Sequence, residues 1–301
     1  MVVKSTENTW NSTQWRDYSL LDCGNGERLE RWGDFVLVRP DPTAIWQTAR
    51  KYNELWKKPD ARYLRSSSGG GHWETINPKI PKNWNITYGD LTFTINLMNF
   101  KHTGVFPEQA ANWNWMRGLI RKFERKCQLN VLNLFAYTGA ATLACAAEGA
   151  AVCHVDAAKG MVDRARTNAH LSGLEGKPVR WIVDDCREFI QREIRRGRRY
   201  DAIIMDPPSY GRGAKGEVWK LEDDLYSFCR LCTEILSDDP GFVLINSYTT
   251  GLSPATLTYI AESTFSSRFH TARAESRELA IKSENSGLYL PAGASCRWTT
   301  S

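Results

Sequence analysis

Residues 130–156, NVLNLFAYTGAATLACAAEGAAVCHVD, decide the fold of this chain. An apolar run (130–137) is followed by a stretch of small residues (139–150) and then by a second apolar run (151–156). This pattern is typical of a strand, a helix and a second strand that pairs parallel to the first. We therefore predict a β-α-β unit here.

The same alternation continues through the rest of the chain. Parallel strands joined by helices need both faces of their sheet covered, so the pattern predicts an α/β, Rossmann-like fold that binds ligands at the carboxyl ends of the strands. The further strands are predicted at 179–185, 200–206, 241–248 and 287–298, and the further helices at 107–126, 160–173, directly after residue 185, and at 219–237 and 253–265.

The first hundred residues differ from the rest. Two segments, 26–40 and 84–97, each hold two extended runs around Gly-Asp, which is typical of a hairpin, and SSSGGGHWE (66–74) predicts a flexible loop. We predict a small β-rich domain over 1–100 and an α/β domain over 101–301. The tryptophans of the first domain are expected to form a core rather than a surface for stacking bases. They are Trp10, Trp15, Trp32, Trp46, Trp56, Trp73 and Trp84.

Composition is ordinary for a globular protein, with 42% hydrophobic and 24% charged residues. No apolar run is long enough to cross a bilayer, and the N-terminus lacks the apolar core of a secretory signal, so we expect a cytoplasmic protein with no membrane partner. The net charge of +5 allows an acidic partner. A basic cluster after the third predicted strand allows two interpretations: its side chains contact phosphates, or they lie at a solvated helix end. Its members are Arg192, Arg195, Arg196, Arg198 and Arg199, followed by Arg212, Lys215 and Lys220, and Lys57, Lys58, Arg62 and Arg65 extend the basic surface to the first domain.

The chain has eight cysteines. Cys229 and Cys232 form a single CxxC inside a predicted helix, and a metal site would need further ligands, so no metal is expected. Cysteines inside apolar segments are predicted to pack in the core. These are Cys127, Cys145, Cys153, Cys186, Cys229 and Cys232.

Small and acidic residues follow the first two strands of the α/β region. Tyr137-Thr138-Gly139 forms a tight turn in which Gly139 lets the backbone approach a ligand, and the helix that begins there offers N–H groups to an anion. The turn is not GxGxxG, which counts against a dinucleotide site and a dehydrogenase. Asp156 ends the second strand. Its carboxylate suits the two hydroxyls of a ribose or the cap of the next helix, and its spacing from the glycine turn favours the ribose.

The next two strands also end in acidic residues. Asp184 and Asp185 follow the third strand, and one of them, with Asp185 preferred, is expected to accept a hydrogen bond from an adenine amino group. The most specific signal is Asp206-Pro207-Pro208-Ser209-Tyr210 after the fourth strand. Two prolines make a rigid extended turn whose carbonyls can hold an amine donor, while Tyr210 can stack on a planar base.

Taken in order, these segments resemble class I S-adenosylmethionine-dependent methyltransferases, in particular the branch of bacterial 23S (large-subunit) rRNA methyltransferases. The resemblance covers about residues 100–300 and rests on HTGVFPEQ (102–109), NLFAYTG (133–139), VDAAKGMVDRARTNAHLSGL (155–174), VDDCREF (183–189), MDPPSYGRG (205–213) and GLYLPAGASCRW (287–298). It implies a mostly parallel sheet with an antiparallel last strand, and S-adenosylmethionine as cofactor. By this resemblance the cofactor site contains Tyr137, Thr138, Gly139, Asp156, Asp185 and Asp206, covered by His102, Thr103, Gly104 and Phe106, while Pro207, Pro208 and Tyr210 face the substrate.

The chain departs from this family in two places. The cytosine-C5 enzymes carry a nucleophilic cysteine after the fifth strand, whereas this chain has NSYTTGL (246–252). Activation of a pyrimidine at C6 needs a thiolate, so the predicted acceptor is a base nitrogen of RNA, with rRNA favoured and Asp206 and the Pro207 carbonyl orienting the amine. The RNA-binding N-terminal module of several relatives is also not evident. Two alternatives stay open: methylation of a protein or small metabolite, and a non-catalytic RNA-binding protein with this fold.

Overall fold

The structure is a computed structural model that describes residues 9–12, 14–48, 52–66, 70–98, 100–123, 128–212, 218–249 and 251–300. For Arg212 it describes only the backbone. It divides the chain into two compact units. The first comprises Met1–Trp10, Ala111–Leu279 and Gly293–Ser301, and the second comprises Asn11–Ala110 and Ala280–Ala292. These compact units differ from the predicted division at residue 100, because residues 280–292 belong to the second unit. The functional boundary at residue 100 stays a prediction.

The first unit is centred on one sheet of eight strands. They are β1 (Thr9–Trp10), β9 (Asn130–Leu134), β10 (Ala151–Asp156), β11 (Val179–Val183), β12 (Ala202–Met205), β15 (Phe242–Ser247), β16 (Arg273–Lys282) and β17 (Tyr289–Thr299). Their order is β1-β16-β17-β15-β12-β9-β10-β11. The five strands from β15 to β11 pair in parallel and β17 runs antiparallel to β15, so the predicted mostly parallel sheet with an antiparallel last strand is confirmed.

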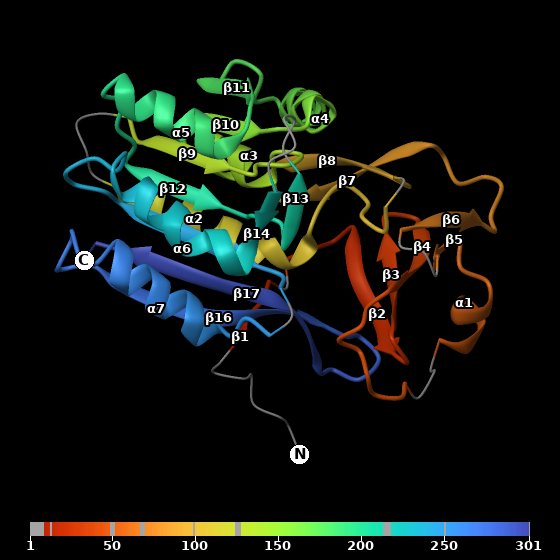
Figure 1. Cartoon of the computed structure of the whole chain (residues 1–301). Helices are drawn as coiled ribbons and strands as arrows, with labels where there is room; N and C mark the ends of the chain where they lie inside the picture. Colours follow the sequence, from red (N-terminus) through yellow and green to blue (C-terminus); the bar gives the residue numbers. More distant parts are fainter. Residues whose placement is uncertain are drawn as a thin grey trace. The chain divides into compact units, whose positions relative to one another are not determined.

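Six helices connect these strands. They are α2 (Ala110–Lys122), α3 (Ala140–Ala147), α4 (Lys159–Leu171), α5 (Cys186–Arg195), α6 (Leu221–Thr233) and α7 (Pro254–Thr264). Figure 1 shows α5, α6 and α7 in front of the sheet and α2 and α3 behind it. Local sequence explains where α7 begins, because Ser253 accepts a hydrogen bond from the N–H of Thr256 and Pro254 occupies the first turn. No helix in the described part of the chain is long and apolar enough to span a membrane.

The strand order places a switch point between β9 and β12. From β9 the chain proceeds outward through β10 and β11, and it then returns to the other side of β9 to form β12 and β15. Helices therefore leave these two neighbouring strands toward opposite faces of the sheet. In such folds the crevice at the carboxyl ends of the two strands is where ligands bind.

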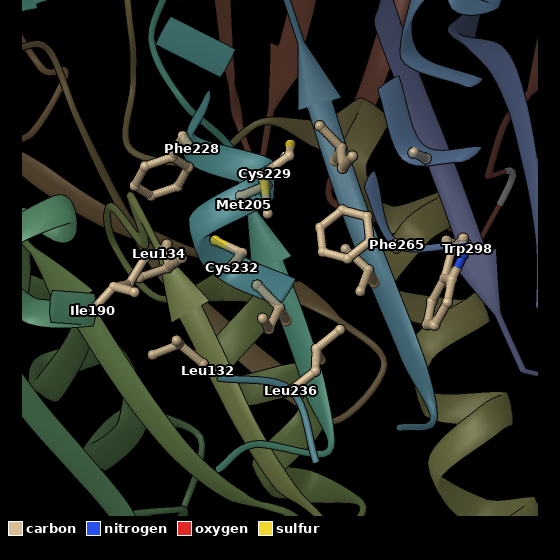
Figure 2. Packing of buried hydrophobic residues seen from close by; sticks show 14 of the residues in the cluster. Leu132, Leu134, Ile190, Met205, Phe228, Cys229, Cys232, Leu236, Phe265 and Trp298 are labelled. Carbon is tan, nitrogen blue, oxygen red and sulfur yellow. Dashed lines mark hydrogen bonds between the residues drawn. The ribbon is translucent and has the colours of Figure 1, made fainter. Parts of the chain in front are cut away.

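The core of the first unit lies between the sheet and the layer of α5, α6 and α7 (Figure 2). Leu132 and Leu134 of β9 face Phe228, Cys229 and Cys232 of α6 in a cluster of buried side chains. The Cys229 and Cys232 side chains are fully buried, which confirms that this CxxC packs in the core. Cys145, Cys153 and Cys186 are buried as predicted, whereas Cys127 lies outside the described residues.

The predicted strands and helices of the α/β region are confirmed, with ends that shift by a few residues. The helix predicted at 107–126 is a 3-10 turn, η1 (Pro107–Gln109), followed by α2, and residues 124–126 lie outside the described part. Two features were not predicted. One is the ten-residue strand β16, and the other is a hairpin of β13 (Tyr210–Arg212) and β14 (Val218–Lys220) directly after Ser209.

The second unit is rich in β-structure. Its elements are β2 (Tyr18–Gly24), β3 (Glu27–Trp32), β4 (Phe35–Pro40), α1 (Asn53–Lys57), β5 (Ala61–Arg65), β6 (Gly71–Thr75), β7 (Asn83–Tyr88), β8 (Leu91–Asn96) and η1. The sheet order is β2-β3-β4-β5-β6, and β7 pairs with β8. The two predicted hairpins are confirmed as β3-β4 and β7-β8, each turning at Gly-Asp. Both Trp32 and Trp56 are buried, as predicted for a core role, whereas Trp46 is 39% exposed.

The prediction of a flexible loop at 66–74 is wrong for the second half of this segment. Residues 67–69 lie outside the described part, but Gly71–Glu74 belong to β6 and pair antiparallel with β5. A Cβ added at Gly71 would lie 2.1 Å from the Leu64 carbonyl oxygen. The glycine therefore permits a close approach of two strands rather than a mobile loop.

Candidate cofactor and substrate site

The turn after β9 has an unusual backbone. Phe135 and Tyr137 have positive φ values of 54° and 49°, and Gly139 has 86°. A non-glycine residue in the left-handed region of backbone conformation costs about 1–2 kcal/mol of folding free energy, so the surrounding contacts must hold the turn in place. The N–H of Ala136 donates to the Val155 carbonyl at 3.1 Å, and Asn168 Nδ2 donates to the Thr138 carbonyl at 3.0 Å. Strain of this kind is characteristic of ligand-binding turns.

Gly139 is required at the start of α3 for two separate reasons. Its φ of 86° is left-handed, and a Cβ there would lie 2.8 Å from the Cβ of Ala165 in α4. The first helical residue follows at once, so the turn brings the N-terminus of α3 to the carboxyl end of β9. The N–H groups of that N-terminus lie at the carboxyl end of β9, and their use by an anion stays a prediction.

We expect Gly139→Ala to lower the free energy of unfolding by about 2–4 kcal/mol, because left-handed strain and overpacking against Ala165 add. Gly149→Ala is the matched control. Gly149 has a similar φ of 88°, but an added Cβ would meet nothing within 4 Å. Urea denaturation of both variants measures the difference. Equal losses would show that the contact with Ala165 relaxes without cost.

Asp156 joins the ends of two neighbouring strands. Its Oδ2 accepts from the N–H of Tyr137 and its Oδ1 accepts from the N–H of Ala158, both at 2.8 Å. Burial raises the pKa of Asp156, and the two backbone N–H groups partly offset this rise. The N-cap of α4 is Ala158, without a side-chain cap, so Asp156 does not cap α4 by its side chain. The carboxylate lies beside the glycine turn, where the sequence analysis placed a ribose ligand.

Asp184 and Asp185 have different structural roles. Asp185 is the N-cap of α5, and its Oδ1 accepts from the N–H groups of Arg187 and Glu188 at 2.9 and 3.0 Å. The Asp184 carboxylate forms an ion pair with Arg192. Asp185 is bonded through Oδ1 and Asp184 through Oδ2, so these contacts do not distinguish the two, and the preference for Asp185 as a ligand residue stays a prediction.

A buried histidine lies beneath the glycine turn. Asn133 Nδ2 donates to Thr142 Oγ1, and Thr142 Oγ1 shares a second hydrogen bond with His154 Nδ1, both at 2.9 Å. The other ring nitrogen, Nε2, is buried and has no hydrogen-bond partner among the described residues. Burial, with the nearby charge of Arg166, lowers the pKa of His154 to about 3.

This histidine predicts a loss of stability in acid. The pKa of an unfolded histidine is about 6.5, so between pH 6.5 and 3 the unfolded state binds more protons than the folded state. The stabilisation is complete above the unfolded pKa and declines as the pH falls, by up to about 1.4 kcal/mol per pH unit. His154→Gln keeps an acceptor for Thr142 but does not titrate. We expect its unfolding free energy to depend less on pH between about 6.5 and 4.5 than that of the wild type, and equal pH dependence in urea denaturation would contradict this role.

The Asp206–Tyr210 segment, which we call the Asp-Pro-Pro turn, follows β12 directly. The Asp206 N–H donates to the Leu134 carbonyl of β9 at 3.4 Å, which ties the turn to the neighbouring strand end. Trp219 Nε1 donates to the Pro208 carbonyl at 2.7 Å, and the Leu221 N–H donates to the Ser209 carbonyl at 3.1 Å. Two of the turn's carbonyls are thus held by the chain itself. The rigidity predicted from the two prolines is reinforced by a partner that the sequence did not suggest.

A second loop is bonded to the same turn. Thr249, which follows β15, donates from Oγ1 to Ser209 Oγ at 2.7 Å. Tyr210 begins β13 and its side chain is 52% exposed. The ring of Trp219 packs against the ring of Phe135, with 5.2 Å between their centroids. Because Trp219 also bonds the Pro208 carbonyl, it links the glycine turn to the Asp-Pro-Pro turn. Sequence reasoning missed Trp219 and Thr249, since neither belongs to a motif.

The carboxyl edge of the sheet thus carries all the predicted residues of the first unit, at the ends of β9, β10, β11 and β12. Thr103, Gly104 and Phe106, by contrast, belong to the second unit, so their predicted place over the cofactor stays a prediction. Pro207 is buried and Pro208 exposed.

The segment 101–108 of the second unit is held by buried charges. Arg39 donates to both oxygens of Glu30, from Nε at 2.6 Å and Nη2 at 2.8 Å, and its Nη1 donates to the Lys101 carbonyl at 3.1 Å. Burial and the nearby Arg39 lower the pKa of His102 to about 3. The Thr103 Oγ1 atom is buried and has no hydrogen-bond partner among the described residues.

The basic cluster at 192–199 begins on the C-terminal half of α5, where Arg192 reaches back to Asp184 after β11. It covers the C-terminal end of α5 and the connection that enters β12 at its amino end. Arg192 and Arg196 form ion pairs with Asp184 and Glu193. The structure therefore favours the reading of a solvated helix end for these two arginines. Lys215 lies outside the described residues.

None of the seven described cysteines is suited to nucleophilic attack. All are buried, and burial raises the pKa of each thiol, for example to about 11 for Cys153. Among the described residues, no group of three His, Cys, Asp or Glu side chains is placed to hold a metal ion.

Comparison with known proteins identifies the family. A family model described as S-adenosylmethionine-dependent methyltransferase matches residues 58–269, so the match begins earlier than the sequence resemblance did. A solved S-adenosylmethionine-dependent methyltransferase from Agrobacterium tumefaciens is 36% identical with a TM-score of 0.91, over 99% of this chain and 95% of that one.

Curated relatives include two ribosomal RNA large subunit methyltransferases. The K/L protein of Syntrophotalea carbinolica is 29% identical over 61% of this chain and 24% of its own length. The K protein of Neisseria meningitidis serogroup B is 33% identical over 51% of this chain and 42% of its own length. The matched part is thus less than half of either relative. Because the family model covers more than half of the chain and its motifs lie at the strand ends described above, the protein belongs to the S-adenosylmethionine-dependent methyltransferase family.

Proposed function

We propose that this methyltransferase modifies a base nitrogen of RNA, with large-subunit rRNA the favoured substrate. The observation that carries the proposal is the Asp-Pro-Pro turn. It follows the strand at the switch point, is held by Trp219 and Thr249, and ends on the exposed ring of Tyr210. A planar acceptor with an amine suits a turn that combines a carboxylate, fixed carbonyls and an aromatic ring.

S-adenosylmethionine, the cofactor of the family, fits the donors and acceptors at this edge. We propose that the N-terminus of α3 receives its carboxylate, that Asp156 accepts from the ribose hydroxyls, and that Asp185 accepts from the adenine amine. Tyr137, Thr138 and Gly139 supply the close backbone. From the family resemblance we also propose that Thr103, Gly104 and Phe106 cover the cofactor. When bound, the cofactor supplies a methyl group on a positive sulfonium.

The residues of the chain then act mainly by positioning. Asp206 and the Pro207 carbonyl accept hydrogen bonds from the acceptor amine and orient its lone pair, Pro208 shapes the wall, and Tyr210 stacks on the base. In-line displacement needs no nucleophile from the protein, which agrees with the buried state and raised pKa of the described cysteines. A cytosine-C5 mechanism would require a thiolate.

The printed names of the curated relatives support RNA as the substrate and large-subunit rRNA as its class. The net charge of +5 is consistent with an anionic partner. We further propose that the protein acts in the cytoplasm, where such a substrate is made.

The test is transfer of radiolabelled methyl groups from S-adenosylmethionine to total RNA from cells that lack the protein, with protein and metabolite fractions in parallel. We expect label in large-subunit rRNA, and nucleoside mass spectrometry should place it on a base nitrogen. Label only in protein or metabolites would overturn the RNA substrate. Label on C5 of a pyrimidine would overturn the proposed chemistry.

A further inference from the structure

We propose that a cavity within the second unit binds one unpaired base of the RNA substrate, away from the methyl-transfer site. This proposal rests on RNA as the substrate. The cavity has a volume of about 430 Å³ and is lined by the 46–48 loop, the β2 end and the turn between β16 and β17. A volume of this size is within the range of small-ligand sites and accommodates a nucleotide.

The floor of the cavity is rigid. Asp22 is buried, and its carboxylate accepts from Trp56 Nε1 at 2.9 Å, from Asn285 Nδ2 at 3.0 Å and from the Thr48 hydroxyl. One side chain thus ties β2 to α1, to the β16-β17 turn and to the loop. A preformed floor lowers the entropic cost of binding a ligand.

The wall formed by the 44–48 loop is also fixed. The N–H groups of Asn25 and Gly26 donate to the carbonyls of Trp46 and Ala44 at 2.7 and 2.8 Å. Trp46 Nε1 donates to the Cys23 carbonyl at 3.0 Å, which sets the plane of the indole. A Cβ at Gly24 would lie 2.9 Å from the Trp46 carbonyl oxygen, so only glycine allows this loop to pack so closely.

The opposite wall is held equally well. The N–H of Asn285 donates to the Leu21 carbonyl at 3.0 Å, and the turn closes with a bond from the Ser283 N–H to the Leu288 carbonyl at 2.8 Å. Tyr289 and Leu290 complete this wall. The two walls come from parts of the chain more than 230 residues apart, yet each is bonded to β2 or its turn.

An aromatic and apolar lining beside polar edges suits a base. Trp46 is 39% exposed and Leu288 is 55% exposed, and both belong to the lining of the cavity. Any of the four bases can stack on an aromatic ring such as that of Trp46. The side chains of Gln47 and Ser286, which also line the cavity, can form hydrogen bonds with the edge of the base.

Positive charge beside the cavity favours a nucleic acid over an apolar peptide. Helix α1 is attached to the floor through Trp56. Lys57 and Lys58 at its end are exposed, and Lys57 forms an exposed ion pair with Glu54 at 3.5 Å. Their ammonium groups can contact the phosphates that flank a bound base. A concave site of this kind needs a base outside a duplex, so single-stranded RNA is the expected ligand.

The test uses the full chain and a 12-nucleotide single-stranded RNA of mixed sequence, with the same sequence annealed into a duplex as a second probe. We expect Trp46→Ala to weaken binding of the single strand by about tenfold, as loss of one stacked base does, and to change duplex binding less than about twofold. Tyr259→Ala, which removes an exposed ring from α7 of the first unit, is the matched control. Fluorescence anisotropy of labelled RNA gives the dissociation constants.

A second variant guards against misfolding at Trp46. Leu288→Asp places a negative charge on the exposed rim, and Leu171→Asp makes the same change at an exposed position of α4. We expect only Leu288→Asp to weaken binding, and photocrosslinking with 4-thiouridine RNA to label residues 44–48 or 283–290. Equal effects of test and control variants, or crosslinks elsewhere only, would overturn the cavity. RNA methylation that stays intact in that case would show that the proposed function survives and the cavity assignment alone fails.

Discussion

Replacing Asp206 with alanine is expected to lower kcat by about 100- to 1000-fold, the usual cost of removing one preorganised polar group from a reaction centre. Under the proposed mechanism this carboxylate orients the acceptor amine, and that contact matters most as the new bond forms. KM for S-adenosylmethionine should change by less than about tenfold, because the other cofactor contacts remain.

The fold gives a reason to expect this effect at residue 206. The position of Asp206 is set by β12, by its bond to the Leu134 carbonyl and by Pro207 directly after it. A side chain on such a fixed backbone holds its direction through the reaction, which is what positioning requires. Asp206→Asn keeps the shape and one acceptor oxygen, so its kcat should lie between those of Asp206→Ala and the wild type.

Asp201→Asn supplies the control. Asp201 lies just before the amino end of the same strand and accepts from the Asn130 N–H at 2.9 Å, a bond that asparagine can keep. Its kcat should stay within about twofold of the wild type, since it is remote from the reacting groups. Steady-state kinetics with cofactor binding measured by calorimetry separates lost chemistry from lost folding. Full activity of Asp206→Ala in a folded protein that binds cofactor would remove Asp206 from the mechanism.

Much of the α/β region could be predicted because buried parallel strands are almost uniformly apolar. Such runs form β9, β10, β12 and β15. Gly139 follows β9, Asp156 ends β10 and Asp-Pro-Pro follows β12, where the chain leaves the sheet. β16 escaped prediction for the opposite reason. In RAESRELAIK (273–282) the buried apolar residues gather at 279–281, and the first six residues show no apolar alternation.

The supports of the site could not be predicted from local pattern. Trp219 contacts Pro208 across 11 residues of chain, and Thr249 contacts Ser209 across 40. Periodicity describes the face on which a residue lies, but it does not describe which distant loop that residue will meet. The dual role of Asp185, a helix cap that is also a predicted ligand residue, likewise became visible only with its bonds to Arg187 and Glu188.

A large loss of stability is expected from replacing Glu30, a fully buried carboxylate of the second unit. Burial alone would raise its pKa, but the charges of Arg28 and Arg39, with hydrogen bonds from Arg39 and Tyr18, lower it to about 2. Glu30→Gln would leave the buried Arg39 guanidinium without its carboxylate, while Arg28 would keep Asp41 at 3.7 Å. We expect the free energy of unfolding to fall by about 3–5 kcal/mol, as for other buried ion pairs that lose one partner.

Glu27→Gln on the same strand is the matched control for this prediction. The Glu27–Arg62 pair is equally short, at 2.5 Å, but its side chains are 34% and 23% exposed, so its loss should cost less than about 1 kcal/mol. In urea denaturation the double variant Glu30→Gln/Arg39→Gln should lose less stability than the sum of its single variants, because the second change removes a charge that the first leaves unpaired. Fully additive losses in the double variant would show that the two buried charges do not depend on each other.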